Sequence, residues 1–142
     1  MTARPSQVEA FIGISQHLAD YADAVDSADF DRLDAILGQA LVVLLTGEEL
    51  VGAETIRALY ESVYSPVSPL PGTGHRRIKH HILNLRVGAP DADDVYPADA
   101  YYLVYVTGDD GPVLKSSGRY RDRVRWQDGT WTILRHEILP DL

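Results

Sequence analysis

The chain has 142 residues, of which 45% are apolar and 24% charged, as expected for one globular domain over residues 1–142 with its own hydrophobic core. Thirteen basic and twenty-one acidic residues give a formal net charge of −8, which argues against nucleic acid or an anionic membrane as partner. The absence of cysteine excludes disulfides and thiolate-held metals, and no apolar stretch fits a membrane span or a signal peptide, so we expect a cytoplasmic protein.

The N-terminal part of the chain predicts two helices. Ser6 and Glu9 form a capping-box pattern, and apolar residues then recur near the 3.6-residue period as far as Asp26. Residues 27–29 interrupt this pattern. A short second helix ends at Gly38, and its apolar residues share one face: Phe30, Leu33, Ile36 and Leu37.

The middle of the chain predicts a short strand, a turn and a third helix. Residues 41–45 are an apolar run typical of a buried strand, and residues 46–49 are typical of a turn. The third helix begins after Gly52 and ends before Pro66, with four residues facing inward: Ile56, Leu59, Tyr60 and Val63. Residues 65–74 are rich in Pro and Gly, and we expect a loop at the rim of the fold.

The following segment predicts two strands separated by an acidic loop. Residues 76–87 alternate, and one face of this strand carries Ile78, His80, Ile82 and Asn84. Residues 88–99 are interpreted as the acidic loop. Residues 100–107 are β-branched and aromatic, and they predict the next strand.

The C-terminal part of the chain predicts a hairpin. Strands at 113–126 and 131–138 flank an Asp-Gly turn at 128–129, and counting outward from a two-residue turn places Asp122 opposite Arg135. We interpret these two residues as an ion pair that fixes the register, since an acid paired with arginine is a poor proton donor. The opposite face of the first strand carries four arginines, which form a solvated surface or a dimer contact: Arg119, Arg121, Arg123 and Arg125.

Three helices followed by a meander of long strands predict an α+β fold, with the helices on one face of an antiparallel sheet. Four segments in this order resemble motifs of the SnoaL-like family in the NTF2-like superfamily, which also contains scytalone dehydratase, bile-acid 7α-dehydratase and polyketide cyclases. They are residues 22–33, 52–56, 79–84 and the hairpin at 118–131. The resemblance implies a cone-shaped fold, in which a curved sheet encloses an apolar pocket that the helices close, and a homodimer.

The resemblance also implies a site. Asp26 matches the acid at the end of the family's first helix, His80 matches a strand histidine, and Tyr21 matches a tyrosine of the bile-acid enzyme. Val25 stands where scytalone dehydratase has a tyrosine, and we expect it among the substrate contacts. Gly118 and Tyr120 stand where that enzyme has a serine and an asparagine. We expect Asn84 on the His80 face and Tyr120 on a neighbouring strand to place a substrate oxygen.

A His–Asp pair in an apolar cavity suits proton transfer, because histidine takes up and returns protons near neutral pH and a carboxylate orients its ring. In this interpretation His80 is the general base, Asp26 orients it, and Tyr21 donates a proton or hydrogen bond. Such chemistry needs neither a metal nor an organic cofactor, and we expect none.

Simpler structural roles compete with this interpretation. Asp26 is also a good N-cap for the second helix, His80 shares a face with two isoleucines, and Tyr21 has the spacing of a core residue. Three further histidines are expected to face outward or to lie in loops, where they form no metal site: His75, His81 and His136.

Three functions therefore follow from the sequence. The first is a cofactor-independent dehydratase, isomerase or cyclase that acts on an apolar polycyclic, polyketide-like or steroid-like substrate. The second is a protein of this fold that binds an apolar ligand without catalysis. The third is an interaction module that is similar to the small subunit of ring-hydroxylating dioxygenases.

Overall fold

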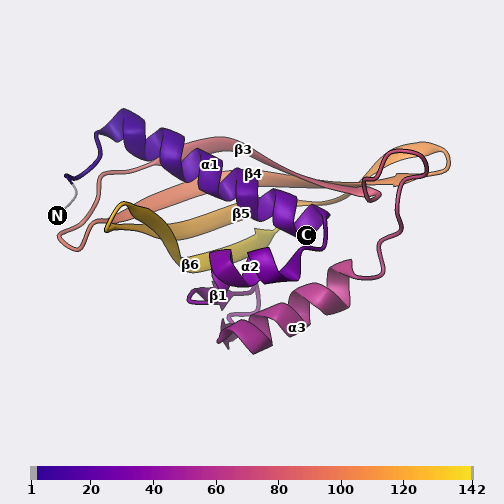
Figure 1. Cartoon of the computed structure of the whole chain (residues 1–142), viewed down its shortest axis with the longest axis horizontal. Coiled ribbons are helices and arrows are strands. Elements are labelled where there is room, and N and C mark those ends of the chain that lie inside the picture. The colour runs from indigo at the N-terminus through magenta and orange to yellow at the C-terminus, as the bar shows by residue number, and fades with distance from the viewer. Residues whose placement is uncertain (1–2, 142) are drawn as a thin grey trace.

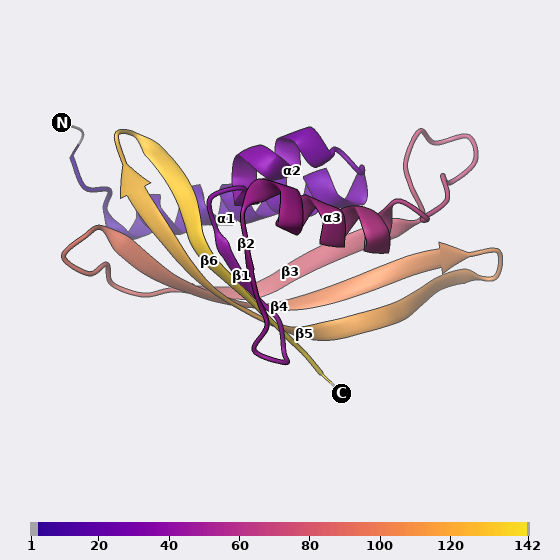
Figure 2. The ribbon, with the colours of Figure 1, turned by 90° about the horizontal axis from the view of Figure 1, so that it is seen from below.

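The computed structural model describes residues 3–141, and it has the predicted α+β architecture. Three helices lie on one face of a single sheet (Figure 1): α1 (Gln7–Asp26), α2 (Phe30–Leu37) and α3 (Ala53–Tyr64). Figure 2 shows the sheet bending beneath the helices, so that its inner face is concave. None of the helices in residues 3–141 is long and apolar enough to cross a membrane.

The sheet has six strands in the order β2-β1-β6-β5-β4-β3. Neighbouring strands are antiparallel except β1 and β6, which are parallel. The strands are β1 (Leu41–Val43), β2 (Glu49–Val51), β3 (Ile78–Val87), β4 (Val95–Gly108), β5 (Gly111–Gln127) and β6 (Thr130–Pro140). The four long strands are those expected from the sequence.

The start of α1 and the start of α2 are both fixed by side-chain caps. At α1, the Ser6 hydroxyl accepts a hydrogen bond from the Glu9 backbone N–H, and the Glu9 carboxylate accepts one from Ser6, which confirms the predicted capping box. At α2, the Asp29 carboxylate accepts from the Arg32 backbone N–H at 3.1 Å. Asp29 therefore takes the capping role, and Asp26 is free for another contact.

Two predicted boundaries are wrong. The acidic segment at 88–99 is not all loop, because β4 begins at Val95 and the side chains of Tyr96 and Ala98 alternate into the core. The predicted turn at 46–49 is also too long, since Glu49 already pairs with Val43 at the start of β2. In both places a few inward-facing side chains extend the ladder into a segment that is polar overall.

The register of the β5–β6 hairpin differs from the predicted one. Pairing follows the prediction as far as Val124 opposite Ile133, and a bulge then places Arg123 opposite Arg135. The predicted Asp122–Arg135 ion pair is therefore wrong, because the one extra residue in β6 turns the following side chains to the other face. Asp122 instead lies opposite His136, which was expected outside the core and is fully buried.

Candidate functional site

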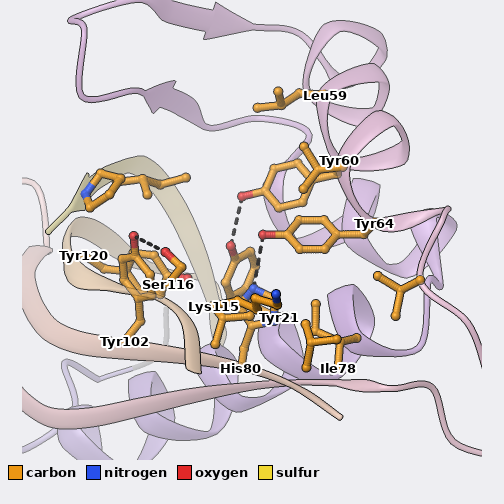
Figure 3. A pocket seen from close by; sticks show the side chains of 16 residues that line it. Tyr21, Leu59, Tyr60, Tyr64, Ile78, His80, Tyr102, Lys115, Ser116 and Tyr120 are labelled. Carbon is orange, nitrogen blue, oxygen red and sulfur yellow. Dashed lines mark hydrogen bonds between the residues drawn. The ribbon is translucent and has the colours of Figure 1, made fainter. Parts of the chain in front are cut away.

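A cavity of about 400 Å³ lies between α3 and the concave face of the sheet (Figure 3). Most of its sixteen lining residues are apolar or aromatic, and they come from α1, α3, the loop that follows α3 and all four long strands. Five tyrosines supply most of the polar atoms that line it: Tyr21, Tyr60, Tyr64, Tyr102 and Tyr120. Such a cavity suits an apolar ligand that is oriented by a few hydroxyl groups.

His80 and Asp26 meet at one side of this cavity. Asp26 is the last residue of α1, and its carboxylate accepts the backbone N–H of His80 at 2.9 Å. The same carboxylate lies 2.6 Å from Nδ1 of the His80 ring. Only 1% of the His80 side chain and 20% of the Asp26 side chain are exposed, so the ring has few alternative partners.

The second ring nitrogen of His80 is the one that faces the cavity. Since the Asp26 carboxylate accepts hydrogen bonds, Nδ1 carries the proton in the neutral ring and Nε2 is left as an acceptor. Nε2 lies 3.2 Å from the Tyr64 hydroxyl, which donates to it. The two rings also contact edge to face, with centroids 5.2 Å apart. Asp26, His80 and Tyr64 thus form one hydrogen-bonded chain that ends in the cavity.

The tyrosine hydroxyls of the cavity are held in their protonated form. Burial raises the pKa of Tyr64 to about 12, and burial also raises the pKa of Tyr21, Tyr60 and Tyr120 well above the ordinary range. The hydroxyls of Tyr21 and Tyr60 lie 2.9 Å apart. One of them donates to the other, so the second keeps a proton that is available to a ligand oxygen.

Of the remaining predicted site residues, Tyr120 lines the cavity, whereas Val25 and Asn84 do not. Tyr120 lines the cavity and stacks on Tyr102, with ring centroids 4.5 Å apart. Val25 is fully buried in the hydrophobic core and is not among the cavity-lining residues. Asn84 is exposed and lies in a separate surface hollow with Arg86, because an irregularity in β3 interrupts the alternation that predicted its direction.

Sequence reasoning missed the role of α3 in the site. Tyr60 was expected to face inward only as a core residue, and Tyr64 was not singled out. Their spacing of four residues places both hydroxyls on one face of the helix, and this pattern is visible in the sequence. A tyrosine pair at this spacing is more common in hydrophobic cores than in sites, so it gives no chemistry by itself.

Arg76, which precedes β3, ties the two helix ends that carry the site. Its guanidinium donates to the backbone oxygens of Asp26 at 3.4 Å and Val67 at 3.1 Å, and also to that of Tyr64. These are the last residues of α1 and α3 and a residue of the loop that follows α3. Arg76 therefore fixes the distance between the helix that carries Asp26 and the helix that carries Tyr64.

Within residues 3–141, no three His, Asp or Glu side chains are grouped so that they could hold a metal ion. His75 and His81 are exposed, as expected. The acid–base groups at the cavity are the Asp26–His80–Tyr64 chain, the other tyrosines and Lys115.

Comparisons with known proteins agree with this fold. The model of the SnoaL-like domain family matches residues 6–137. A candidate aromatic ring hydroxylase from Novosphingobium aromaticivorans has 27% identity and a TM-score of 0.72, over 94% of this chain and 90% of its own. A candidate scytalone dehydratase from the same organism has 17% identity and a TM-score of 0.74, over 95% and 86%.

A third similar structure has a fold that is called cystatin-like. A protein of unknown function with a cystatin-like fold from Nostoc punctiforme has 16% identity and a TM-score of 0.76, over 98% of this chain and 96% of its own. No curated protein sequence matches the chain significantly.

Proposed function

The chain belongs to the SnoaL-like domain family, and from this premise we propose that it catalyses cofactor-independent proton transfer on an apolar, ring-containing ketone or hydroxy-ketone. The reaction class is dehydration, double-bond isomerisation or cyclisation, each of which begins with loss of a proton next to a carbonyl group. The observation that carries the proposal is the position of His80, whose Nδ1 is held by Asp26 while Nε2 faces the cavity.

In the proposed reaction, His80 Nε2 takes a proton from the carbon next to the substrate carbonyl. The electrons of the broken C–H bond move toward the carbonyl oxygen and form an enolate. Asp26 stabilises the imidazolium that results, because its carboxylate already accepts the Nδ1–H. The imidazolium then returns the proton, either to a leaving hydroxyl group in a dehydration or to another carbon in an isomerisation.

The tyrosine pair Tyr21–Tyr60 is suited to bind the enolate oxygen. Burial raises the pKa of both hydroxyls, so both remain protonated at neutral pH. Their mutual hydrogen bond uses one of the two protons and leaves the other for the substrate. A donor fixed beforehand in a largely apolar cavity favours the charged enolate more than the neutral ketone.

The proposal is tested with 2-tetralone, a bicyclic apolar ketone with exchangeable α-protons. The protein is expected to accelerate deuterium uptake at these carbons in D₂O, as followed by NMR. His80→Ala is expected to lower this acceleration by about 10²–10⁴-fold, the usual contribution of a positioned general base. His81→Ala is the matched control, since His81 is adjacent, exposed and on the other face of β3.

One observation favours a second candidate function, a protein that binds an apolar ligand without catalysis. The Tyr64 hydroxyl already occupies the hydrogen-bonding position of Nε2. Saturable binding of 2-tetralone with no deuterium uptake above the buffer rate contradicts the enzyme and supports this second function. Equal uptake by the wild type and His80→Ala also contradicts the enzyme as proposed.

A further inference from the structure

Lys115 is the one lysine among the residues that line the cavity, which include no arginine, aspartate or glutamate. It is exposed, so it lies where the cavity meets solvent. Within residues 3–141 no carboxylate lies in ion-pair contact with its ammonium, and the nearby Asp141 carboxylate accepts from Ser117 instead. A cation without an ion-pair partner among the described residues, beside a cavity whose other lining side chains are mostly neutral, points to a charged ligand.

A β-bulge directs Lys115 to this position. In β4 and β5, Val104 pairs with Ser116, but the next residue of β4, Tyr105, pairs with Leu114. Lys115 is therefore the extra residue of the bulge. In a regular strand, the odd-numbered residues of this part of β5 would all lie on the outer face of the sheet. Without the bulge, Lys115 would therefore share that face with Arg119. Bulges commonly redirect one side chain in this way.

The register of the sheet also gives the distance of Lys115 from the proposed base. His80 pairs with Val104, which in turn pairs with Ser116, next to Lys115. Two strand spacings separate these positions, which is roughly 10 Å between backbones. Since both side chains extend from these backbones into the lining of one cavity, a fused two-ring ligand with a substituent can contact both residues.

We propose that the ligand of this cavity carries an anionic group, a carboxylate by preference, and that Lys115 binds it at the cavity entrance. For catalysis this inference rests on the proposed function and specifies its substrate as an apolar ring ketone with an acidic substituent remote from the reacting carbon. The hydroxyls of Ser116 and Tyr102, 3.5 Å apart, lie beside Lys115 in the cavity lining and supply further donors.

The position of Lys115 makes such an ion pair favourable. The ammonium stays in contact with water at the entrance, so binding an anion does not require the full desolvation of either charge. The protein as a whole has a net charge of −8, which repels anions. A local cation at the entrance offsets this repulsion there.

The test compares two ligands that differ in charge, 2-naphthoate and 2-naphthalenemethanol. Their dissociation constants are measured by isothermal titration calorimetry with the wild type, Lys115→Met and Lys115→Arg. Lys115→Met is expected to weaken 2-naphthoate binding by about five- to tenfold, between the values for an exposed ion pair and for a charge-assisted hydrogen bond. Binding of 2-naphthalenemethanol is expected to stay unchanged, and Lys115→Arg is expected to retain 2-naphthoate.

The matched control is Arg119→Met, which removes a cation from the same strand but from its outer face. It is expected to leave both dissociation constants unchanged. Raising the salt concentration is expected to weaken 2-naphthoate binding to the wild type and not to Lys115→Met. Three results would overturn the inference. Lys115→Met could weaken the binding of both ligands equally, Arg119→Met could weaken 2-naphthoate binding as much as Lys115→Met does, or the wild type could fail to bind 2-naphthoate.

This experiment is independent of turnover. If Lys115→Met selectively loses 2-naphthoate while 2-tetralone shows no deuterium uptake, the anionic ligand class stands and the proposed catalysis fails. If deuterium uptake depends on His80 but binding shows no dependence on charge, the catalysis stands and the role of Lys115 is wrong.

Discussion

The fold contains two His–Asp pairs, which we call the cavity pair (Asp26–His80) and the core pair (Asp122–His136). Their hydrogen bonds are nearly the same: the carboxylate lies 2.6 Å from Nδ1 in the cavity pair and 2.7 Å from Nδ1 in the core pair. The pairs differ in what surrounds the second ring nitrogen. In the cavity pair Nε2 meets the Tyr64 hydroxyl and the cavity, whereas in the core pair Nε2 has no hydrogen-bond partner among residues 3–141.

The groups packed around the second ring nitrogen explain this difference, because the two histidine side chains are buried to nearly the same extent. Both side chains of the core pair are fully buried, and the His136 ring packs against Tyr21 and Tyr120, with centroids 4.9 and 4.6 Å away. These same tyrosines line the cavity on their other side, so they separate the two pairs. A His–Asp pair is therefore not itself a mark of proton transfer. A route from the free nitrogen to a ligand is also needed, and only the cavity pair has one.

The largest expected difference between the two pairs is in the free energy of unfolding that is lost when the histidine is removed. His136→Ala leaves the Asp122 carboxylate fully buried without its donor, and we expect the free energy of unfolding to fall by about 3–5 kcal/mol. His80→Ala is expected to cost about 1–2 kcal/mol, because the Asp26 carboxylate is partly exposed and keeps the backbone N–H of residue 80. Urea denaturation of both variants measures the difference.

A double variant serves as the control for this prediction. Asp122→Val with His136→Leu replaces both polar groups by apolar ones, and such replacements of a buried pair are often nearly neutral. We therefore expect the double variant to be more stable than His136→Ala. A double variant that is less stable than the single one contradicts the view that the unpaired carboxylate causes the loss.

The next effect concerns catalysis. Asp26→Asn removes the charge that stabilises the His80 imidazolium, and we expect 2-tetralone exchange to slow by about 10- to 100-fold, less than on removal of the base itself. The same change in the core pair, Asp122→Asn, is expected to lower stability but to leave the exchange rate of the folded protein unchanged. Slower exchange by folded Asp122→Asn contradicts the separation of the two pairs.

The tyrosines between the pairs predict a loss of stability at alkaline pH. Burial raises the pKa of Tyr21 and Tyr120, so the folded state keeps their protons above the pH of about 10 at which the unfolded chain releases them. The free energy of unfolding is thus unaffected by these groups below about pH 10 and falls above it, by about 1.4 kcal/mol per pH unit for each such tyrosine.

Urea denaturation at increasing pH, with phenolate absorbance as a second signal, tests this prediction. Tyr21→Phe removes one of the titrating groups, so its stability curve is expected to fall less steeply than that of the wild type. If the free energy of unfolding of the wild type does not decline above about pH 10, Tyr21 and Tyr120 do not keep their protons in the folded state, and the prediction is wrong.

How far the sequence predicts these two pairs depends on the kind of signal. The cavity pair follows from residues 22–33 and 79–84, whose resemblance to the family aligned Asp26 with His80. The core pair was missed because counting from the hairpin turn assumes a regular ladder, and the bulge in β6 moves His136 opposite Asp122. The direction of Asn84 was missed for the same reason in β3. Bulges are set by packing across the sheet, and alternation in one strand does not report them.

The smallest expected effect comes from removal of the Tyr64 hydroxyl, which contacts His80 in the cavity pair and has no counterpart in the core pair. Tyr64→Phe keeps the ring against His80 and removes the donor to Nε2, so we expect a loss of about 0.5–1.5 kcal/mol in the free energy of unfolding. We also expect faster 2-tetralone exchange, because the Tyr64 hydroxyl competes with the substrate for Nε2. Tyr60→Phe serves as the contrast: it removes a hydroxyl from the same face of α3 that does not touch His80 and belongs to the proposed enolate-binding pair, so we expect slower exchange. If Tyr64→Phe instead slows exchange tenfold or more, the Tyr64 hydroxyl acts on the substrate itself, and the cavity pair works as part of a three-residue unit that the core pair lacks.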